Sequence, residues 1–240
     1  MNIPKFIHQI WWDFSGKNRK ISEYNLEWEK NRQKIEKKYT NNGWKYKLWS
    51  HKEVQHLVRK TFPEQYKVWK QLSNIEKHDI ARCIILYNYG GLYCDLDMIY
   101  NKLFIMEKYS SNVKIILRNT TTTKISITND IIISCPKHPF WVRYINSIEP
   151  PSLFNFIKPK IIQTFQTTGP KKIQKLYEET LFKKEIKIDS TLTNKYFINL
   201  SARSWMSYVD MIYYVIYYVI YYLFFIFCFI YCIRIILRII

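Results

Sequence analysis

The sequence predicts an α/β domain with a largely parallel sheet, followed by a helix able to cross a membrane. Short apolar stretches alternate with amphipathic helical patterns, and a long uncharged run lies near the C-terminus. The chain has 240 residues, and the part that precedes this run is long enough for one domain with a hydrophobic core but short for two. We therefore expect one soluble domain at residues 1–207 and a membrane anchor at residues 208–240.

The N-terminal part alternates between strand and helix patterns. Residues 5–11 form a short apolar strand, residues 22–39 a charged amphipathic helix, and residues 44–50 a strand of alternating polarity. Ser50 and Glu53 are spaced as a capping box, in which the two side chains satisfy the first free amides of a helix.

A second capping box, Ser73 with Glu76, begins the helix that carries the chemistry. Gly90 and Gly91 end it, because glycine tolerates the backbone conformation that terminates a helix. The next strand is LYCDLD, residues 92–97. Further strands are predicted at residues 113–118, 130–134 and 196–200, with helices after Pro139 and Pro170.

The charge balance is strongly basic, with 37 Lys+Arg against 19 Asp+Glu, a net charge of +18. Such a surface attracts nucleic acid, anionic lipid headgroups or a polyphosphate. The basic residues are spread over many helices, which indicates a solvated face for most of them. Zinc-finger spacing, a basic zipper and an aromatic ribonucleoprotein pattern are all missing from the sequence, so we expect no nucleic-acid partner.

Of the five cysteines, two lie in the apolar tail and the other three are widely separated. Their spacing fits neither a disulfide framework nor a metal site. Buried thiols that pack as small apolar groups are the expectation.

The tail is uncharged from Met211 to Ile233. Its 23 residues make a helix of about 35 Å, enough to cross a hydrocarbon core of about 30 Å. A helix buried in the core of the domain is a less suitable interpretation of this run, because no side of the helix is polar. The start of the sequence carries no secretory signal, which would leave the domain in the cytosol, whereas Arg234 and Arg238 favour the opposite orientation. Orientation stays open.

Two pairs of charged residues suggest chemistry. Asp79 and Arg82 are three apart and share one face of their helix, and alternation puts Asp95 and Asp97 on one side of an extended segment. Carboxylates suit Mg²⁺ or Mn²⁺, which often bridge to substrate phosphates, and an arginine can neutralise a phosphate. These residues predict a site for a metal-bound polyphosphate, although a lone D-x-D is more often a solvated turn.

The full run SNIEKHDIARCIILYNYGGLYCDLD, residues 73–97, resembles the sugar-binding signature of glycosyltransferase family 32. That signature is a helical Asp-x-x-Arg followed by Leu-Tyr-x-Tyr-Gly-Gly-x-Tyr-x-Asp-x-Asp. The resemblance implies a GT-A-like, Rossmann-type nucleotide-diphospho-sugar transferase domain, here followed by a C-terminal transmembrane helix.

Other segments resemble the same family. IPKFIHQIWW resembles its first strand and base-binding loop, with Trp11 stacking on the base, although a core role for Trp11 or Trp12 is the alternative. Residues 129–141 resemble the segment that lines the donor sugar, and residues 167–170, TTGP, an active-site loop.

The C-terminal end of the predicted domain departs from the family pattern. Ser204-Trp205 resembles a terminal pair that approaches the diphosphate, but the histidine that precedes it in many relatives is missing from NLSARSW. If that imidazole is a contact, Arg203 or Ser201 would have to replace it.

The resemblance implies specific roles. Asp97, helped by Asp95, holds a divalent metal, with Mn²⁺ favoured and Mg²⁺ as the alternative. Catalytic roles fall on Asp79, Arg82, Asp95 and Asp97. Donor binding falls on Trp11, Asp79, Arg82, Tyr93, Asp95, Asn129, Asp130 and Trp205. We expect His78 to be a surface or packing residue and His138 to be structural.

The amino-acid sequence of residues 129–141 and 167–170 is most similar to that of fungal inositol-phosphoceramide mannosyltransferases. The resemblance implies a metal-dependent, retaining hexosyltransferase that moves mannose from a GDP- or UDP-linked donor to a lipid or glycan acceptor at an endomembrane. Alternatives are a transferase of protein-linked glycans, a haloacid-dehalogenase-type phosphohydrolase, and a membrane-tethered binding module with a decayed catalytic site.

Overall fold

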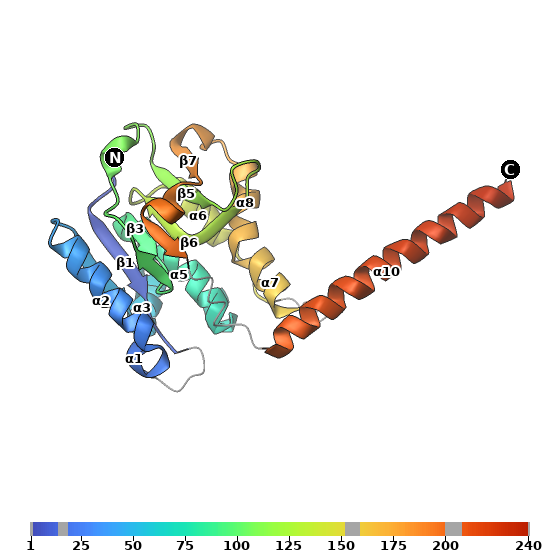
Figure 1. The fold of residues 1–240 in the computed structure, drawn as a ribbon, viewed down its shortest axis with the longest axis horizontal. Helices are drawn as coiled ribbons and strands as arrows, with labels where there is room; N and C mark the ends of the chain where they lie inside the picture. Colours follow the sequence, from blue (N-terminus) through green and yellow to red (C-terminus); the bar gives the residue numbers. More distant parts are fainter. Residues whose placement is uncertain (1, 14–18, 152–158, 200–207, 240) are drawn as a thin grey trace. The chain divides into compact units, whose positions relative to one another are not determined.

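A computed structural model describes residues 2–13, 19–151, 159–199 and 208–239, and contains a mixed six-stranded sheet of order β2-β1-β3-β6-β5-β7 (Figure 1). Its strands are β1 (Phe6–Ile10), β2 (Lys45–Trp49), β3 (Gly91–Cys94), β5 (Ile115–Asn119), β6 (Ile127–Ser134) and β7 (Ile186–Asp189). A second sheet pairs β4 (Met98–Tyr100) with β8 (Phe197–Asn199).

The α/β class is confirmed, but the sheet is less parallel than the sequence suggested. β6 runs antiparallel to both of its neighbours, β3 and β5. The cause is the short connection between β5 and β6, residues 120–126, because a parallel pair needs a crossover of a dozen residues or more. The mostly polar residues 120–126 are the sequence signal for this reversal of direction.

The helices described before residue 200 include those predicted after Ser50, Ser73, Pro139 and Pro170, and three short ones that were not predicted. They are α1 (Ile21–Tyr24), α2 (Leu26–Thr40), α3 (His51–Thr61), α4 (Tyr66–Gln71), α5 (Asn74–Tyr89), α6 (Pro139–Asn146), α7 (Lys160–Thr167), α8 (Pro170–Glu178) and α9 (Leu192–Lys195). Two 3-10 turns, η1 (Met106–Lys108) and η3 (Lys183–Glu185), lie in the connections before β5 and β7. Both predicted capping boxes are present, at Ser50 with Glu53 and at Ser73 with Glu76.

The helix predicted at residues 22–39 is two helices. Asn25 is extended, and its side chain accepts a hydrogen bond from Trp28 N at 3.1 Å, so it caps α2 instead of continuing α1. Asparagine favours such caps over helix interiors because its side chain competes for backbone amides.

Two apolar layers enclose the sheet. On one face α3, α5, α6 and α8 bury residues such as Val54, Ile84 and Phe140 against Tyr93 and Ile132. On the other face, α2 and the β4–β8 ribbon bury a separate cluster that includes Ile35, Cys94 and Phe197. Cys83, Cys94 and Cys135 are free and buried, as predicted.

Gly91 brings β3 close to β1. Its φ is +97°, and a Cβ there would lie 2.1 Å from Phe6 O, so only glycine fits without movement of the backbone. The preceding Gly90 also has a positive φ, +62°, and ends α5. The glycine pair predicted to end this helix therefore also sets the packing of the two central strands.

The chain divides into two compact units, residues 1–151 with 165–202 and residues 152–164 with 203–240. The second unit contains α10 (Tyr208–Ile239). Within α10, the 21 residues Met211–Tyr231 are long and apolar enough to cross a membrane, and none of the most apolar window is buried. The predicted boundary at residue 207 lies outside the described residues.

Candidate active site

The helix α5 places a carboxylate and a guanidinium against the sheet. Its capping box, with Ser73 Oγ donating to Glu76 Oε2 at 2.7 Å, fixes where the helix begins. Asp79 and Arg82 then lie one turn apart, with exposed fractions of only 4% and 7%. Two buried charges of this kind need partners, because desolvation of an unpaired ion is costly.

Arg82 links α5 to the end of β3. Its Nη1 donates to Asp79 Oδ1 at 2.9 Å, and its Nη2 lies 3.1 Å from Asp95 Oδ1. The hydroxyl of Tyr93 accepts from Arg82 Nε at 3.3 Å and donates to Asp95 Oδ1 at 2.5 Å. The predicted pairing of Asp79 with Arg82 is present, and the same guanidinium reaches the first acid of the D-x-D.

Two further segments converge on Asp79. Asn129 Nδ2 from β6 donates to Asp79 Oδ1 at 2.7 Å, and Thr168 Oγ1, just beyond α7, donates to Asp79 Oδ2 at 3.1 Å. Burial is the main influence on this carboxyl and raises its pKa, while nearby Arg82 opposes the rise. Asp79 is therefore the junction at which α5, β6 and the TTGP segment meet.

The D-x-D lies on a turn rather than on a strand, which corrects the alternation argument. β3 ends at Cys94, and Met98 N donates to Asp95 O at 3.2 Å, closing a four-residue turn. Asp95 N in turn donates to Asp130 O at 2.9 Å. The two acids are both partly exposed, and the turn, not the pleat of a strand, sets their positions.

Asn31, on α2, holds this turn and was missed from the sequence. Its Nδ2 donates to Leu96 O at 3.2 Å and also to Met98 O, while its Oδ1 accepts from Tyr100 N at 3.2 Å. The side chain of Leu96 packs with Ile21 and Trp28. An asparagine on a charged helix gave no signal, because its partners are backbone atoms 65 to 69 residues away.

The electrostatics favour a cation beside the two acids. The pKa of Asp95 is raised to about 7, first by burial and also by the charge of Asp97, against the lowering effect of Arg82. Repulsion between Asp95 and Asp97 would be relieved by a bound cation. Among the residues that the structure describes, no group of three or more His, Cys, Asp or Glu is placed to hold a metal. Two carboxylates still suit Mg²⁺ or Mn²⁺, which keep waters and take further oxygens from a substrate.

Asn129 and Asp130 point to different clusters, although both were predicted to contact the donor. The pairing of β5 with β6 slips between Leu117 and Arg118, so residues 129–131 have no partner on β5. Asn129 reaches Asp79, whereas the carboxylate of Asp130 pairs with Arg118 and accepts from Thr128 Oγ1 at 2.7 Å. Arg118 also went unnoticed in the sequence, and it offsets the charge of Asp130 beneath the D-x-D turn.

The aromatic residues after β1 are packed. Trp11 is half-buried, its Nε1 donates to Arg19 O at 3.0 Å, and its ring centroid lies 5.3 Å from that of Tyr24. Trp12 is buried, and its ring lies 3.7 Å from the ring of His78. Trp12 therefore has the core role, His78 is a packing residue, and Trp11 is half-buried beside Tyr24.

His138 is structural, as predicted. It caps α6, with its Nδ1 accepting from Phe140 N at 3.2 Å, and its Nε2 lies 3.3 Å from Glu185 Oε2. The predicted residues Trp205, Ser204, Arg203 and Ser201 lie outside the described residues.

Comparison with known families identifies part of the chain. Residues 26–124 match the family described as "Glycosyltransferase sugar-binding region containing DXD motif". This segment contains Asp79, Arg82, Tyr93 and both acids of the D-x-D.

Similar curated proteins include three glycosyltransferases. Inositol phosphoceramide mannosyltransferase 1 of Schizosaccharomyces pombe is 32% identical over 70% of this chain and 49% of its own length. Mannosyl phosphorylinositol ceramide synthase SUR1 of Saccharomyces cerevisiae is 29% identical over 70% of this chain and 40% of its own length. Uncharacterized glycosyltransferase L373 of Acanthamoeba polyphaga mimivirus is 31% identical over 57% of this chain and 52% of its own length. The chain spans about half the length of these relatives.

Similar solved structures have low sequence identity. PaToxG glycosyltransferase has a TM-score of 0.42 and 19% identity, covering 74% of this chain and 70% of its own. The ligand-free glycosyltransferase domain of the YGT toxin has a TM-score of 0.46 and 11% identity. The match covers 78% of this chain and 80% of the toxin domain.

Proposed function

We propose, on the premise that residues 26–124 match the sugar-binding region of glycosyltransferases containing a DXD motif, that the chain is a metal-dependent, retaining hexosyltransferase with a GT-A-like domain. The proposed donor is a nucleotide-diphosphate sugar, GDP- or UDP-linked, with mannose as the preferred hexose. The observation that carries the proposal is the Arg82 guanidinium between Asp79 and Asp95, inside the matched segment.

Each residue of this cluster has a proposed task. Asp95 and Asp97 would hold Mn²⁺ or Mg²⁺, which supplies charge neutralisation for the departing nucleotide diphosphate. Arg82 presents fixed N–H donors to the sugar-phosphate side of the donor. Asp79 orients Arg82 and Asn129, and its remaining acceptor capacity serves sugar hydroxyls. Tyr93 keeps Asp95 in place through its hydroxyl.

The proposed acceptor is a membrane-associated glycolipid of the inositol-phosphoceramide type. Two facts support this choice: several similar proteins are named for mannosyl transfer to such lipids, and Met211–Tyr231 can cross a membrane. A lipid headgroup would lie near the plane of that anchor. We place the chain at an endomembrane, with a single C-terminal span and a glycan or lipid as acceptor.

A donor panel tests the proposal. The full chain in detergent is incubated with UDP- and GDP-sugars and Mn²⁺, with Asp97→Asn as the inactive comparison. Cleavage of one donor with release of its nucleotide diphosphate, lost in Asp97→Asn and stimulated by inositol phosphoceramide as the sugar moves to that lipid, supports the proposal. Release of phosphate from monoesters would instead indicate a phosphohydrolase. Binding to anionic vesicles without turnover of any donor would indicate a decayed binding module.

A further inference from the structure

The helix α10 carries one face made almost entirely of tyrosine. Its N-terminal half contains three Tyr-Tyr pairs spaced four residues apart, Tyr213, Tyr214, Tyr217, Tyr218, Tyr221 and Tyr222. At 3.6 residues per turn these six fall within about half of the helix circumference. The opposite half of the same stretch carries only Val215, Ile216, Val219 and Ile220.

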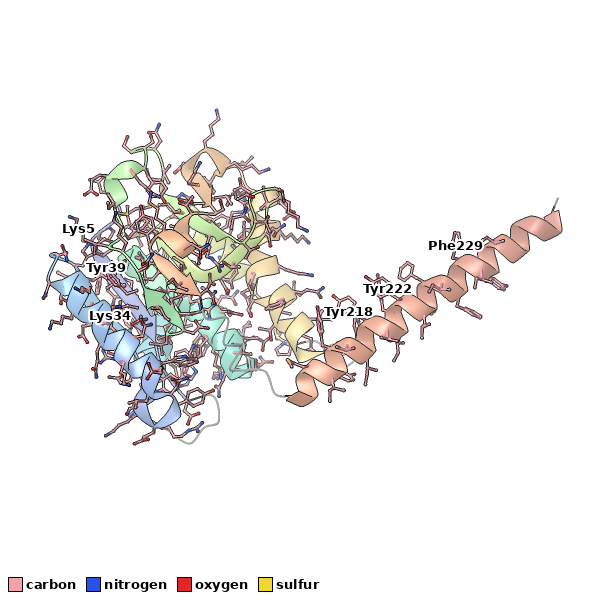
Figure 2. All side chains as sticks on the ribbon, in the orientation of Figure 1. Lys5, Lys34, Tyr39, Tyr218, Tyr222 and Phe229 are labelled. Carbon is pink, nitrogen blue, oxygen red and sulfur yellow. The ribbon has the colours of Figure 1, made fainter. Side chains whose placement is uncertain are left out.

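The structure agrees with this division. Figure 2 shows Tyr218 and Tyr222 projecting from the same side of α10, and their ring centroids lie 6.3 Å apart. The ring centroids of Tyr214 and Tyr218 lie 4.9 Å apart, and those of Tyr217 and Tyr221 lie 6.3 Å apart. The rings therefore form a continuous stripe along the helix.

The position of the stripe leaves few hydrogen-bond partners within reach of its hydroxyls. Tyr221 is the central residue of the span Met211–Tyr231, so it lies about 15 Å along the helix from either end. A tyrosine side chain is much shorter than that and cannot reach the headgroups from the centre. In the described part of the chain, the hydroxyls of Tyr217, Tyr218, Tyr221 and Tyr222 make no hydrogen bond.

In hydrocarbon, such hydroxyls gain from a partner that both donates and accepts. Lipid tails offer neither. A tyrosine hydroxyl does both, so a tyrosine face is complementary to an identical face related by a two-fold axis. A purely apolar partner helix would leave the hydroxyls of Tyr217, Tyr218, Tyr221 and Tyr222 unpaired.

We propose that α10 is a self-association element, in which the tyrosine faces of two copies of this chain pair within the membrane through interhelical hydroxyl hydrogen bonds. This inference rests on the membrane anchor of the proposed function. It assigns the Tyr-Tyr repeat a role beyond attachment, since any apolar sequence of this length would anchor the chain.

The test uses the full chain with fluorescent donor or acceptor proteins fused to its N-terminus, reconstituted in phosphatidylcholine vesicles. Flotation of the vesicles first reports attachment, and energy transfer at a series of protein-to-lipid ratios then reports self-association. Tyr218, Tyr221 and Tyr222 are changed together to phenylalanine, which keeps the rings and removes only the hydroxyls. Ile212, Ile216 and Ile220 changed together to valine provide the control on the opposite face.

We expect about threefold weaker association for each interhelical hydroxyl bond removed, from an average near 0.6 kcal/mol, and more than tenfold for the triple phenylalanine variant. The valine control should associate as the unchanged chain does. Flotation without energy transfer in the unchanged chain overturns the self-association, as does full association of the phenylalanine variant. Failure to float overturns the anchor itself.

Discussion

Arg82 Nη2 lies 3.1 Å from Asp95 Oδ1, and this contact connects the helix α5 to the D-x-D turn. The same guanidinium pairs with Asp79, so one cation faces two carboxylates, with Asp97 next along the turn. When all three acids are ionised, the cluster carries a net charge of about −2, which a divalent cation would balance. Ion pairing and metal binding at this site therefore depend on one another.

The first prediction concerns Asp97. Asp97→Asn should lower turnover of the sugar donor at least a hundredfold, because an amide cannot replace an anionic ligand of a hard cation. The fold should persist, since Asp97 is partly exposed on a turn. Donor hydrolysis and Mn²⁺-induced thermal shift should both be measured, with Glu64→Gln on the exposed surface as the control. Normal turnover, or an unchanged Mn²⁺ shift, would remove Asp97 from the metal site.

The second prediction concerns the shape of the cation at position 82. Arg82→Lys keeps the charge but should reduce kcat/KM about a hundredfold, because one ammonium cannot hold Asp79, Tyr93 and Asp95 in fixed directions. Arg32→Lys is the matched control. Arg32, on α2, also pairs with two acids, Glu29 and Glu36, and neither of them belongs to the cluster of Asp79 and Asp95. Equal activity of the two variants would reduce Arg82 to a structural ion pair.

The third prediction is a pH dependence of stability that arises from His8. Its Nε2 lies 2.8 Å from Gly90 O, and its Nδ1 accepts from Trp49 Nε1 at 3.1 Å, an arrangement that requires the neutral ring. Burial lowers the pKa of His8 from 6.5 to about 4; the bond to Gly90 opposes this, and Lys47 adds to it. The unfolded chain then binds the proton more readily than the folded chain.

The stability that His8 contributes is therefore complete above about pH 6.5 and is lost as the pH falls toward about 4. We expect the Tm of the chain to fall between about pH 7 and pH 5, and the fall to be shallower in His8→Asn, which cannot be protonated. Thermal unfolding at several pH values in metal-free buffer checks this. Parallel curves for the two proteins would show that His8 is not the source.

Much of the fold could be predicted because its signals are local. The two capping boxes, the glycines after α5 and the apolar strands each depend on a few neighbouring residues, and the structure contains all of them. The direction of β6 depends instead on the length of the loop between β5 and β6, which is too short for a parallel crossover. The break at Asn25 was visible as a capping residue inside a helical pattern.

The candidate site was predictable only in part. Asp79, Arg82, Asp95 and Asp97 stood out because the whole run of residues 73–97 resembles a family signature, and the structure brings Asp79, Arg82 and Asp95 into contact. Thr168 lies in the TTGP segment that the sequence had already indicated. Arg118 and Asn31 were not indicated, since Arg118 meets Asp130 only through the pairing of β5 with β6 and Asn31 bonds only to backbone atoms 65 to 69 residues away. Such residues have no pattern of their own, so a single sequence gives no reason to select them.

The last prediction tests Asn31 as a positioning residue. Asn31→Ala removes the donor to Leu96 O and Met98 O and the acceptor for Tyr100 N, which should cost about 1–3 kcal/mol of stability. The D-x-D turn should then be held less firmly, so we expect a roughly tenfold higher Mn²⁺ concentration for half-maximal activity. Gln33→Ala is the control, because Gln33 lies on the same helix and its exposed side chain donates a hydrogen bond to Glu29 instead of to the D-x-D turn. A loss of stability with unchanged Mn²⁺ dependence would show that Asn31 supports the fold without positioning the acids.

Saturation with Mn²⁺ should restore most of the activity of Asn31→Ala but none of that of Asp97→Asn, because only the first variant retains both carboxylates.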